Sequence, residues 1–180
     1  VPIVPTFAFQ ANLADYGEEV GASPSVQALF RREISDSAVM LRRAFDAGIP
    51  LLCGTESGFS ITPYGEWHYR ELEVFVKELG LTSLEAIKAA TSDNAVALRL
   101  QGETGAIEAG RLADIIVVDG DPVADVTILG ESTRIKQVYI GGVAQPTGPI
   151  TPVRGDPPGW RVSHYGDRIL NYEFVQGRKK

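Results

Sequence analysis

The sequence predicts an α/β fold followed by a small β-rich part. Apolar residues recur at helical spacing over residues 34–45, and Gly48 and Pro50 end that helix. The apolar run 51–53 follows directly, and its short length before a glycine is typical of a strand buried on both faces, as in a parallel sheet. After Gly102 the helical spacing gives way to runs of β-branched residues. Helix, tight turn and buried strand are the order of elements in α/β folds.

Upstream of this helix, the sequence predicts one strand and one further helix. Residues 1–9 are rich in Val, Ile and Phe, which favours a short buried strand, and the prolines place it at a sheet edge or at the beginning of the strand. A polar stretch, 10–24, separates it from a helix that Ser25 is expected to cap and that runs at least to Arg32.

Three more helices are expected between the buried run and the β-rich part. Apolar spacing predicts a helix over 72–79. Thr82 and Glu85 stand in the register of a capping box, so a second helix begins there. A short third helix is expected over 92–98. The helices belong to the α/β part, which we end near residue 100.

The β-rich part contains two strands and a hairpin signal. Residues 113–118 and 135–140 are the predicted strands, and Gly141 and Gly142 form a strong two-residue turn before Val143. We therefore divide the chain into an α/β part (1–100), a β part (101–145) and a Pro- and Gly-rich tail (146–180), which is expected to be extended.

Composition narrows the function classes. The chain has 180 residues, a formal charge of -6 and 44% hydrophobic residues, which is typical of a globular protein. The acidic balance argues against binding to nucleic acid or to anionic membranes, because phosphate contacts need clustered Lys and Arg. No apolar run approaches a membrane span. The single cysteine, Cys53, excludes an internal disulfide and suits a reducing compartment, so we expect a cytoplasmic protein.

Four segments, in order, resemble the amidohydrolase superfamily, and in particular the metal-dependent hydrolases related to imidazolonepropionase and prolidase. The third and fourth are the most specific, because they match in both order and spacing. The segments are 47–57 (AGIPLLCGTES), 68–72 (HYREL), 81–95 (LTSLEAIKAATSDNA) and 105–122 (GAIEAGRLADIIVVDGDP).

This resemblance implies the carboxy-terminal part of a larger fold: the last strands and helices of a (β/α)8 TIM-like barrel, followed by a small β-sandwich portion. Two parallel strands alone leave open edges and exposed helix faces. The resemblance therefore implies a partner, either the missing amino-terminal half of the barrel as a separate chain or a homo-oligomer. An incomplete sequence is the third possibility.

The resemblance places the chemistry at Glu56, where barrel enzymes hold reactive groups at the ends of strands. In the family, an Asp at this position takes a proton from metal-bound water and passes it to the leaving group. Here the residue is Glu, one methylene longer, so the site either keeps this base or is altered. Without the resemblance, Glu56 is a loop carboxylate that caps a turn.

The resemblance also suggests a substrate-binding role for His68, and Trp67 and Tyr64 are candidates for the wall of a substrate pocket. The alternative is an aromatic helix start that simply packs. Cys53 is interpreted as a small apolar strand residue, and His164 receives no role.

Family members bind one or two divalent metals, and zinc is the expected one here. The usual ligands are a His-x-His pair, a Lys or Glu and two further His. This chain has two histidines and no His-x-His, so most ligands must lie outside it, with Glu56 as its own contribution to the metal site.

Three functions are compared on these residues. The first is part of a hydrolase that cleaves a C–N bond (amide, urea, carbamate or dipeptide) in a small substrate; a phosphotriester is a further possibility. The second is a non-catalytic structural or interaction fragment that lacks the metal site. The third, a nucleotide-binding domain, needs a glycine-rich strand-to-helix turn that residues 54–58 do not provide.

Overall fold

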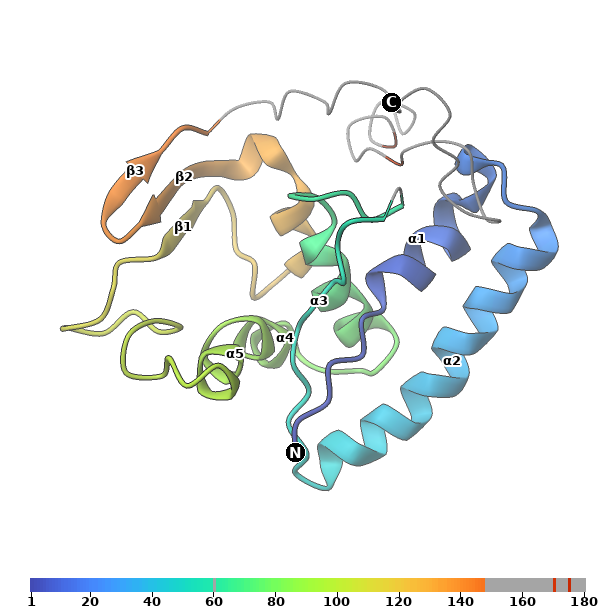
Figure 1. Cartoon of the computed structure of the whole chain (residues 1–180), viewed down its shortest axis with the longest axis horizontal. Helices are drawn as coiled ribbons and strands as arrows, with labels where there is room; N and C mark the ends of the chain where they lie inside the picture. The colour runs from blue at the N-terminus through green and yellow to red at the C-terminus, as the bar shows by residue number, and fades with distance from the viewer. Residues whose placement is uncertain (60, 148–169, 171–174, 176–180) are drawn as a thin grey trace.

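The computed structural model describes residues 1–59, 61–147, 170 and 175, and Figure 1 shows their arrangement. The helices are α1 (Ala8–Tyr16), α2 (Pro24–Asp46), α3 (His68–Lys77), α4 (Ser83–Ala90) and α5 (Ser92–Ala97). The strands are β1 (Ile115–Val118), β2 (Ile135–Ile140) and β3 (Val143–Gln145). The described residues also form the short 3-10 helices η1 (Gly17–Val20), η2 (Val126–Gly130) and η3 (Ser132–Arg134).

Helix α2 is one continuous helix of 23 residues, where the sequence pattern predicted two helices. Its cap is Ser23, whose hydroxyl accepts from Val26 N at 3.4 Å, with Pro24 in the first turn; Ser25 as the cap was wrong. Phe30, Ile34 and Ala38 form its buried stripe at helical spacing. The stripe continues across the predicted break, and α2 packs on α1.

The strand predicted over residues 1–9 is a second prediction that differs from the structure. Within 1–9 only Ile3 pairs, in an isolated parallel bridge to Leu51: Ile3 N donates to Pro50 O (3.0 Å) and Leu52 N donates to Ile3 O (2.8 Å). Helix α1 begins at Ala8 and occupies much of the stretch predicted as polar. The buried run 51–53 is confirmed as buried at Leu51 and Leu52, but it is a bridge rather than a regular strand.

The helices α3 to α5 confirm the expected order of elements. Helix α3 begins at His68, which the sequence interpretation placed near a helix start, and its buried face includes polar Glu71 as well as Phe75. The capping box is present: Glu85 N donates to Thr82 Oγ1 (3.2 Å) and Thr82 N donates to Glu85 Oε2 (2.8 Å). In Figure 1, α1 lies between α2 and α3, and these helices enclose the main hydrophobic core.

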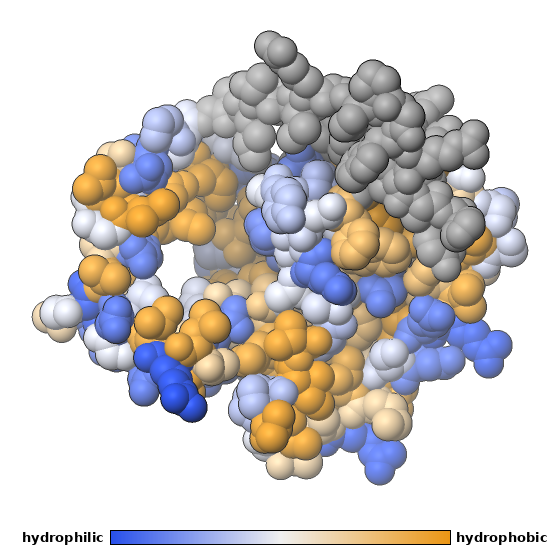
Figure 2. Space-filling model, in the orientation of Figure 1, coloured by the Kyte–Doolittle hydropathy of each residue, from blue (hydrophilic) through white to orange (hydrophobic). Residues whose placement is uncertain are grey.

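The β part is a three-stranded antiparallel sheet in the order β1-β2-β3. Gly141 (φ 56°) and Gly142 (φ 80°) form the predicted hairpin turn. The sheet lies at the opposite end of the molecule from α2 (Figure 1) and carries apolar side chains on its surface (Figure 2), among them Ile140 and Val143. A second sandwich sheet and further barrel strands are not among the described residues.

The β part is joined to the helices by a close contact between α3 and η2. A Cβ atom at Gly130 would lie 2.5 Å from the Tyr69 ring, so only glycine allows this approach. The predicted tail lies outside the described residues apart from 146, 147, 170 and 175. Within the described part, no helix is long and apolar enough to cross a membrane.

Candidate functional site

Glu56 lies at the end of the buried segment that pairs with Ile3, and its side chain is exposed. Its backbone is left-handed, with φ 48°. Thr6, three residues after Ile3, is also left-handed, with φ 57°. For a residue with a Cβ atom this conformation costs about 1–2 kcal/mol. The paired segments therefore both turn through strained residues at the same edge, which is typical of functional sites.

The segment that ends in Glu56 is fixed on both sides. A Cβ atom at Gly54 would lie 2.7 Å from Val4 Cγ1, so the two paired segments touch without space for a side chain. On the other side, Cys53 N donates to Ala89 O (3.3 Å) and Asn94 Nδ2 donates to Cys53 O (2.8 Å). Helices α4 and α5, which carry the third family-like segment, thus hold the backbone that leads to Glu56.

Thr55 connects this segment to the start of α3. Its side chain is buried, with 6% exposure, and its hydroxyl lies 3.1 Å from Ser57 Oγ and 3.1 Å from His68 Nδ1. His68 is the first residue of α3. Although the residue has exposed surface, desolvation of the ring lowers the pKa of His68, which favours neutral imidazole at neutral pH. The structure therefore brings His68 to the loop of Glu56.

The two aromatic candidates occupy different environments. Trp67 is in the core, with 2% exposure and a left-handed φ of 65°, and its Nε1 donates to Leu170 O at 2.9 Å. Tyr64 is 78% exposed, and a Cβ atom at Gly58 would lie 2.9 Å from Tyr64 Oη. Tyr64 thus lies over the loop after Glu56, whereas Trp67 is buried in the core directly before the first residue of α3. Their contact with substrate stays a prediction.

Glu71 is a buried carboxyl group that the sequence interpretation left without a role. It is fully buried, at 0% exposure, and its Oε1 accepts a hydrogen bond from Ala8 N at 2.5 Å. Burial raises the pKa of Glu71 to about 7, although the backbone groups of Ala8 and Phe7 and the charge of Arg70 oppose the rise. Its spacing of four from buried Phe75 is the signal that places it on the inner face of α3.

The environment of Cys53 agrees with its interpretation as a small apolar residue without a chemical role. Burial, and to a lesser degree the charge of Glu71, raises the pKa of its thiol to about 12. A thiol with so high a pKa is a poor nucleophile and a poor metal ligand at neutral pH.

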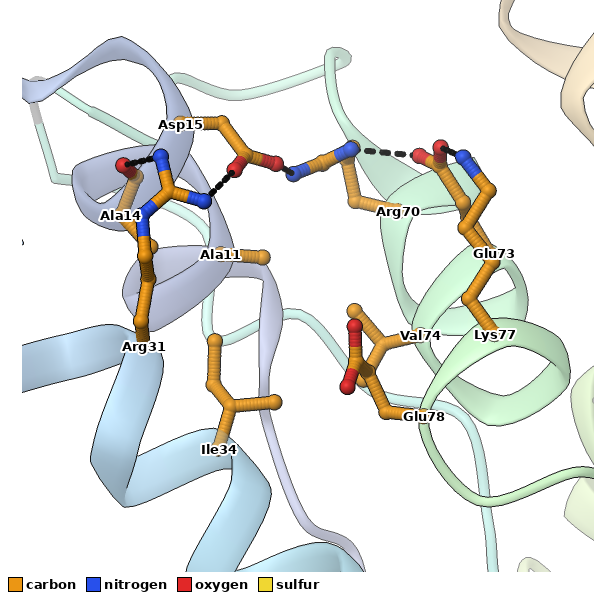
Figure 3. A pocket seen from close by; sticks show the side chains of 10 residues that line it. All are labelled: Ala11, Ala14, Asp15, Arg31, Ile34, Arg70, Glu73, Val74, Lys77 and Glu78. Atoms are coloured by element: carbon orange, nitrogen blue, oxygen red, sulfur yellow. Dashed lines mark hydrogen bonds and ion pairs between the residues drawn. The ribbon is translucent and has the colours of Figure 1, made fainter.

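A cavity of about 270 Å³ opens between α1, α2 and α3 (Figure 3), away from the site residues. A chain of ion pairs crosses it: Arg70 bonds Asp15 and Glu73 at 2.5 Å each, Lys77 bonds Glu73, and Arg31 bonds Asp15 at 3.2 Å. None of Glu56, Thr55 and His68 lines this cavity. The ion pairs connect three helices, while Glu78 also lines the cavity and lies outside this chain of ion pairs.

The described residues do not form a metal site by themselves. Within them, no group of three or more His, Cys, Asp and Glu side chains is placed to hold an ion. Glu56 offers one exposed carboxylate, and His68 has its Nδ1 atom engaged with Thr55. A metal bound beside Glu56 would need ligands from outside this part of the chain.

Comparison with known proteins gives consistent matches. A model of the amidohydrolase family matches residues 15–144. The ochratoxinase of Aspergillus niger is 33% identical over 100 residues, which are 55% of this chain and 20% of the relative. A putative prolidase from Bifidobacterium longum has a TM-score of 0.68 and 28% identity over 82% of this chain and 36% of that protein. A prolidase crystallised with N-methylphosphonate-L-proline has a TM-score of 0.64 and 27% identity over 82% and 35%.

The likeness to these solved structures confirms the predicted α/β fold. The chain spans only a fifth of the length of the curated relative and about a third of the length of the solved prolidases.

Proposed function

This chain belongs to the amidohydrolase family, and we propose that it forms the carboxy-terminal part of a hydrolase that cleaves an amide-type C–N bond in a small substrate. The ochratoxinase and prolidase relatives suggest hydrolysis of amide or peptide bonds. Among the substrates that the sequence interpretation considered, we therefore favour an amide or a dipeptide over a urea or carbamate, and we add N-acyl amino acids as amides to be tested.

The observation that carries this proposal is the backbone of Glu56. A carboxylate is held in a strained left-handed conformation at the end of a buried segment, with its side chain free to reach outward. Strain of this kind persists only where the surrounding structure imposes it. Gly54, Cys53 and Asn94 supply that constraint through the contacts described above.

In the proposed reaction, Glu56 moves one proton. Its carboxylate accepts a proton from the attacking water as the oxygen bonds to the substrate carbonyl carbon. It then gives this proton to the leaving nitrogen as the C–N bond breaks, which releases an amine and a carboxylic acid. A carboxylate suits both steps because the same oxygen serves first as base and then, once protonated, as acid.

The family is generally metal-dependent, and we propose that this chain acts with a divalent metal, with zinc as the first candidate. The ligands beyond Glu56 come from a polypeptide outside the described residues: the amino-terminal part of the barrel or another copy of the chain. The exposed apolar side chains of β2 and β3 support such a partner, because large apolar side chains gain by burial. The cytoplasm stays our prediction for its location.

A second candidate is a non-catalytic module that keeps this part of the fold. Two observations favour it: Glu replaces the Asp expected at position 56, and the described residues form no metal-binding group. It differs from the first proposal in predicting neither a bound metal nor amide cleavage in any assembly.

The two candidates are separated by one preparation of the protein with the polypeptides that co-purify with it. Metal content is measured by mass spectrometry, and release of amine is measured with Xaa-Pro dipeptides, N-acyl amino acids and a phenylurea. Stoichiometric metal together with amine release from the first two substrate classes supports the hydrolase. A metal-free preparation that releases no amine supports the module.

A further inference from the structure

The cavity between α1, α2 and α3 has the size and the lining of a site for a small molecule. Its volume of about 270 Å³ lies just below the roughly 300–1,000 Å³ of pockets that hold drug-sized ligands, so a smaller ligand is expected. The apolar part of the lining consists of Ala11, Ala14, Ile34 and Val74. In Figure 3, Ile34 on α2 and Val74 on α3 lie on opposite sides of the open space, which suits an aliphatic group between them.

The charged residues of the lining form two groups of opposite net charge. The chain of ion pairs joins three cations to two carboxylates, so it carries an excess of positive charge. Its members are Asp15, Arg31, Arg70, Glu73 and Lys77. Glu78 lines the same cavity and forms no ion pair with a described residue. In Figure 3 the chain of ion pairs runs along one side of the open space and the Glu78 carboxylate lies on the other. The cavity therefore has a positive side and a negative side.

The positive side has hydrogen-bond donors to spare. Lys77 Nζ carries three N–H donors, and one of them bonds Glu73 Oε1. Arg31 carries five, of which two bond Asp15 Oδ1 and Ala14 O. The side chains of Arg31 and Lys77 are 59% and 60% exposed, so their remaining donors are open to a ligand. Hydrogen bonds between such cations and a carboxylate are among the strong ones in proteins, so this side suits a ligand carboxylate.

The negative side is explained poorly by the stability of the helix that carries it. Glu78 is the residue that ends α3. A negative charge at the carboxy-terminal end of a helix is disfavoured by the helix dipole, whereas a positive charge there is favoured. A cation beside Glu78 would therefore pair with its carboxylate and also be stabilised by the end of α3. This side suits a ligand ammonium group.

We propose that this cavity binds a free amino acid as its zwitterion. Glu78 pairs with the ammonium group, and Arg31 and Lys77 bind the carboxylate. Ile34 and Val74 contact an aliphatic side chain. A simple cation would meet the excess positive charge and a simple anion would meet Glu78, whereas a zwitterion is complementary to both sides. The inference does not depend on the proposed function, because the candidate site residues described above do not line this cavity.

The site is tested by titrating the ¹⁵N-labelled chain with L-leucine and following its backbone amides by ¹H–¹⁵N NMR. The amides of Ala11, Ala14, Val74 and Glu78 should shift and saturate with one common Kd, while those of residues 54–58 should not shift. The absence of saturable shifts would overturn the inference. Shifts confined to residues 54–58 would also overturn it, because they would place the amino acid at the loop of Glu56 instead.

Two analogues of the probe test the need for both charges. N-acetyl-L-leucine lacks the ammonium group, and L-leucinamide lacks the carboxylate. Each should bind at least about tenfold more weakly than L-leucine, the typical effect of losing a hydrogen bond between charged groups. Equal affinity for either analogue would overturn the assignment of a zwitterion.

Substitutions assign each charge of the ligand to one side of the cavity. Glu78→Gln should weaken L-leucine binding about tenfold and leave the already weak binding of N-acetyl-L-leucine unchanged. The matched control is Glu33→Gln, an exposed position on α2 that does not line the cavity, which should keep wild-type affinity. Lys77→Gln keeps a donor for Glu73 but removes the charge, and it should weaken L-leucine and not L-leucinamide.

Thermal denaturation shows whether each variant is folded before its affinity is compared with that of the wild type. Wild-type affinity for L-leucine in folded Glu78→Gln would overturn the inference. If that variant does not fold, the two analogues still decide the question on the wild-type chain.

Discussion

The carboxylate of Glu71, on α3, caps the amino terminus of α1: its Oε1 atom accepts a hydrogen bond from the backbone N of Ala8 at 2.5 Å, across 63 residues of sequence. The first N–H groups of a helix have no partner within it, and a negative charge there is also favoured by the helix dipole. Glu71 therefore holds the start of α1, which follows shortly after Thr6, against α3.

Removing this cap should destabilise the fold. Glu71→Ala leaves the buried Ala8 N–H without its acceptor and creates a cavity, at a cost of about 2–4 kcal/mol in the free energy of unfolding. Glu71→Gln keeps an acceptor oxygen and should cost less than half as much. Urea denaturation of the two variants measures the difference, and an equal loss for Ala and Gln would argue against the hydrogen bond as the cause.

The stability of the chain should also depend on pH through Glu71. The pKa of Glu71 is raised to about 7 in the folded state from 4.5, so the folded chain binds this proton more tightly than the unfolded chain. Its contribution to stability is fully present below pH 4.5 and is lost as the pH rises through about 7. The free energy of unfolding of Glu71→Gln relative to wild type should therefore increase from pH 5 to pH 8. Parallel curves for the two proteins would contradict the raised pKa.

Relief of strain at Glu56 should separate stability from function. Asn adopts the left-handed conformation more readily than Glu, so Glu56→Asn should stabilise the fold by about 0.5–1 kcal/mol while it removes the carboxylate that we propose to be catalytic. The matched control is Glu33→Asn, an exposed position within α2, where Asn should cost about 0.5 kcal/mol through its helix propensity. Thermal denaturation compares the two, and a destabilised Glu56→Asn would show that no strain is released.

Two glycines of the fourth family-like segment provide a matched test of close packing. Gly105 (φ 87°) has a left-handed backbone and is also closely surrounded. An added Cβ would clash there, because it would lie 2.6 Å from Ala95 Cβ and 3.1 Å from Thr91 O. Gly110 (φ 88°) has the same backbone but nothing within 4 Å. Gly110→Ala should cost about 1 kcal/mol and Gly105→Ala about 1–3 kcal/mol more. Equal losses of stability in the two variants would mean that the neighbours of Gly105 move aside at little cost in free energy.

Local signals in the sequence predicted local structure correctly. The Thr82–Glu85 capping box and the Gly141–Gly142 turn each depend on residues that are close in the chain, and both are present. Helix α1 was missed because its support is distant: its cap comes from Glu71, and its buried face packs on α2 and α3. Strand predictions at the amino terminus were too long for the same reason, since pairing needs a neighbour that the sequence does not reveal.

The candidate site was predictable in outline only. The position of Glu56 after a buried run follows from the pattern of Gly54 and the apolar residues, but its left-handed backbone does not. The contact between Thr55 and His68 joins two segments through a turn of irregular conformation, which spacing cannot predict. Whether an aromatic residue is buried, as Trp67 is, or exposed, as Tyr64 is, depends on packing across the whole fold.

The proton transfer that we propose for Glu56 is tested most directly by the turnover of Glu56→Gln in the active assembly, with Glu33→Gln as the control for loss of an exposed charge. Gln preserves the size of the side chain but cannot accept and return a proton at neutral pH. We expect kcat to fall by about 10²–10⁴-fold, with the unfolding midpoint unchanged and with wild-type activity for the control. Turnover of Glu56→Gln within a few-fold of wild type would contradict the role of Glu56 in the reaction.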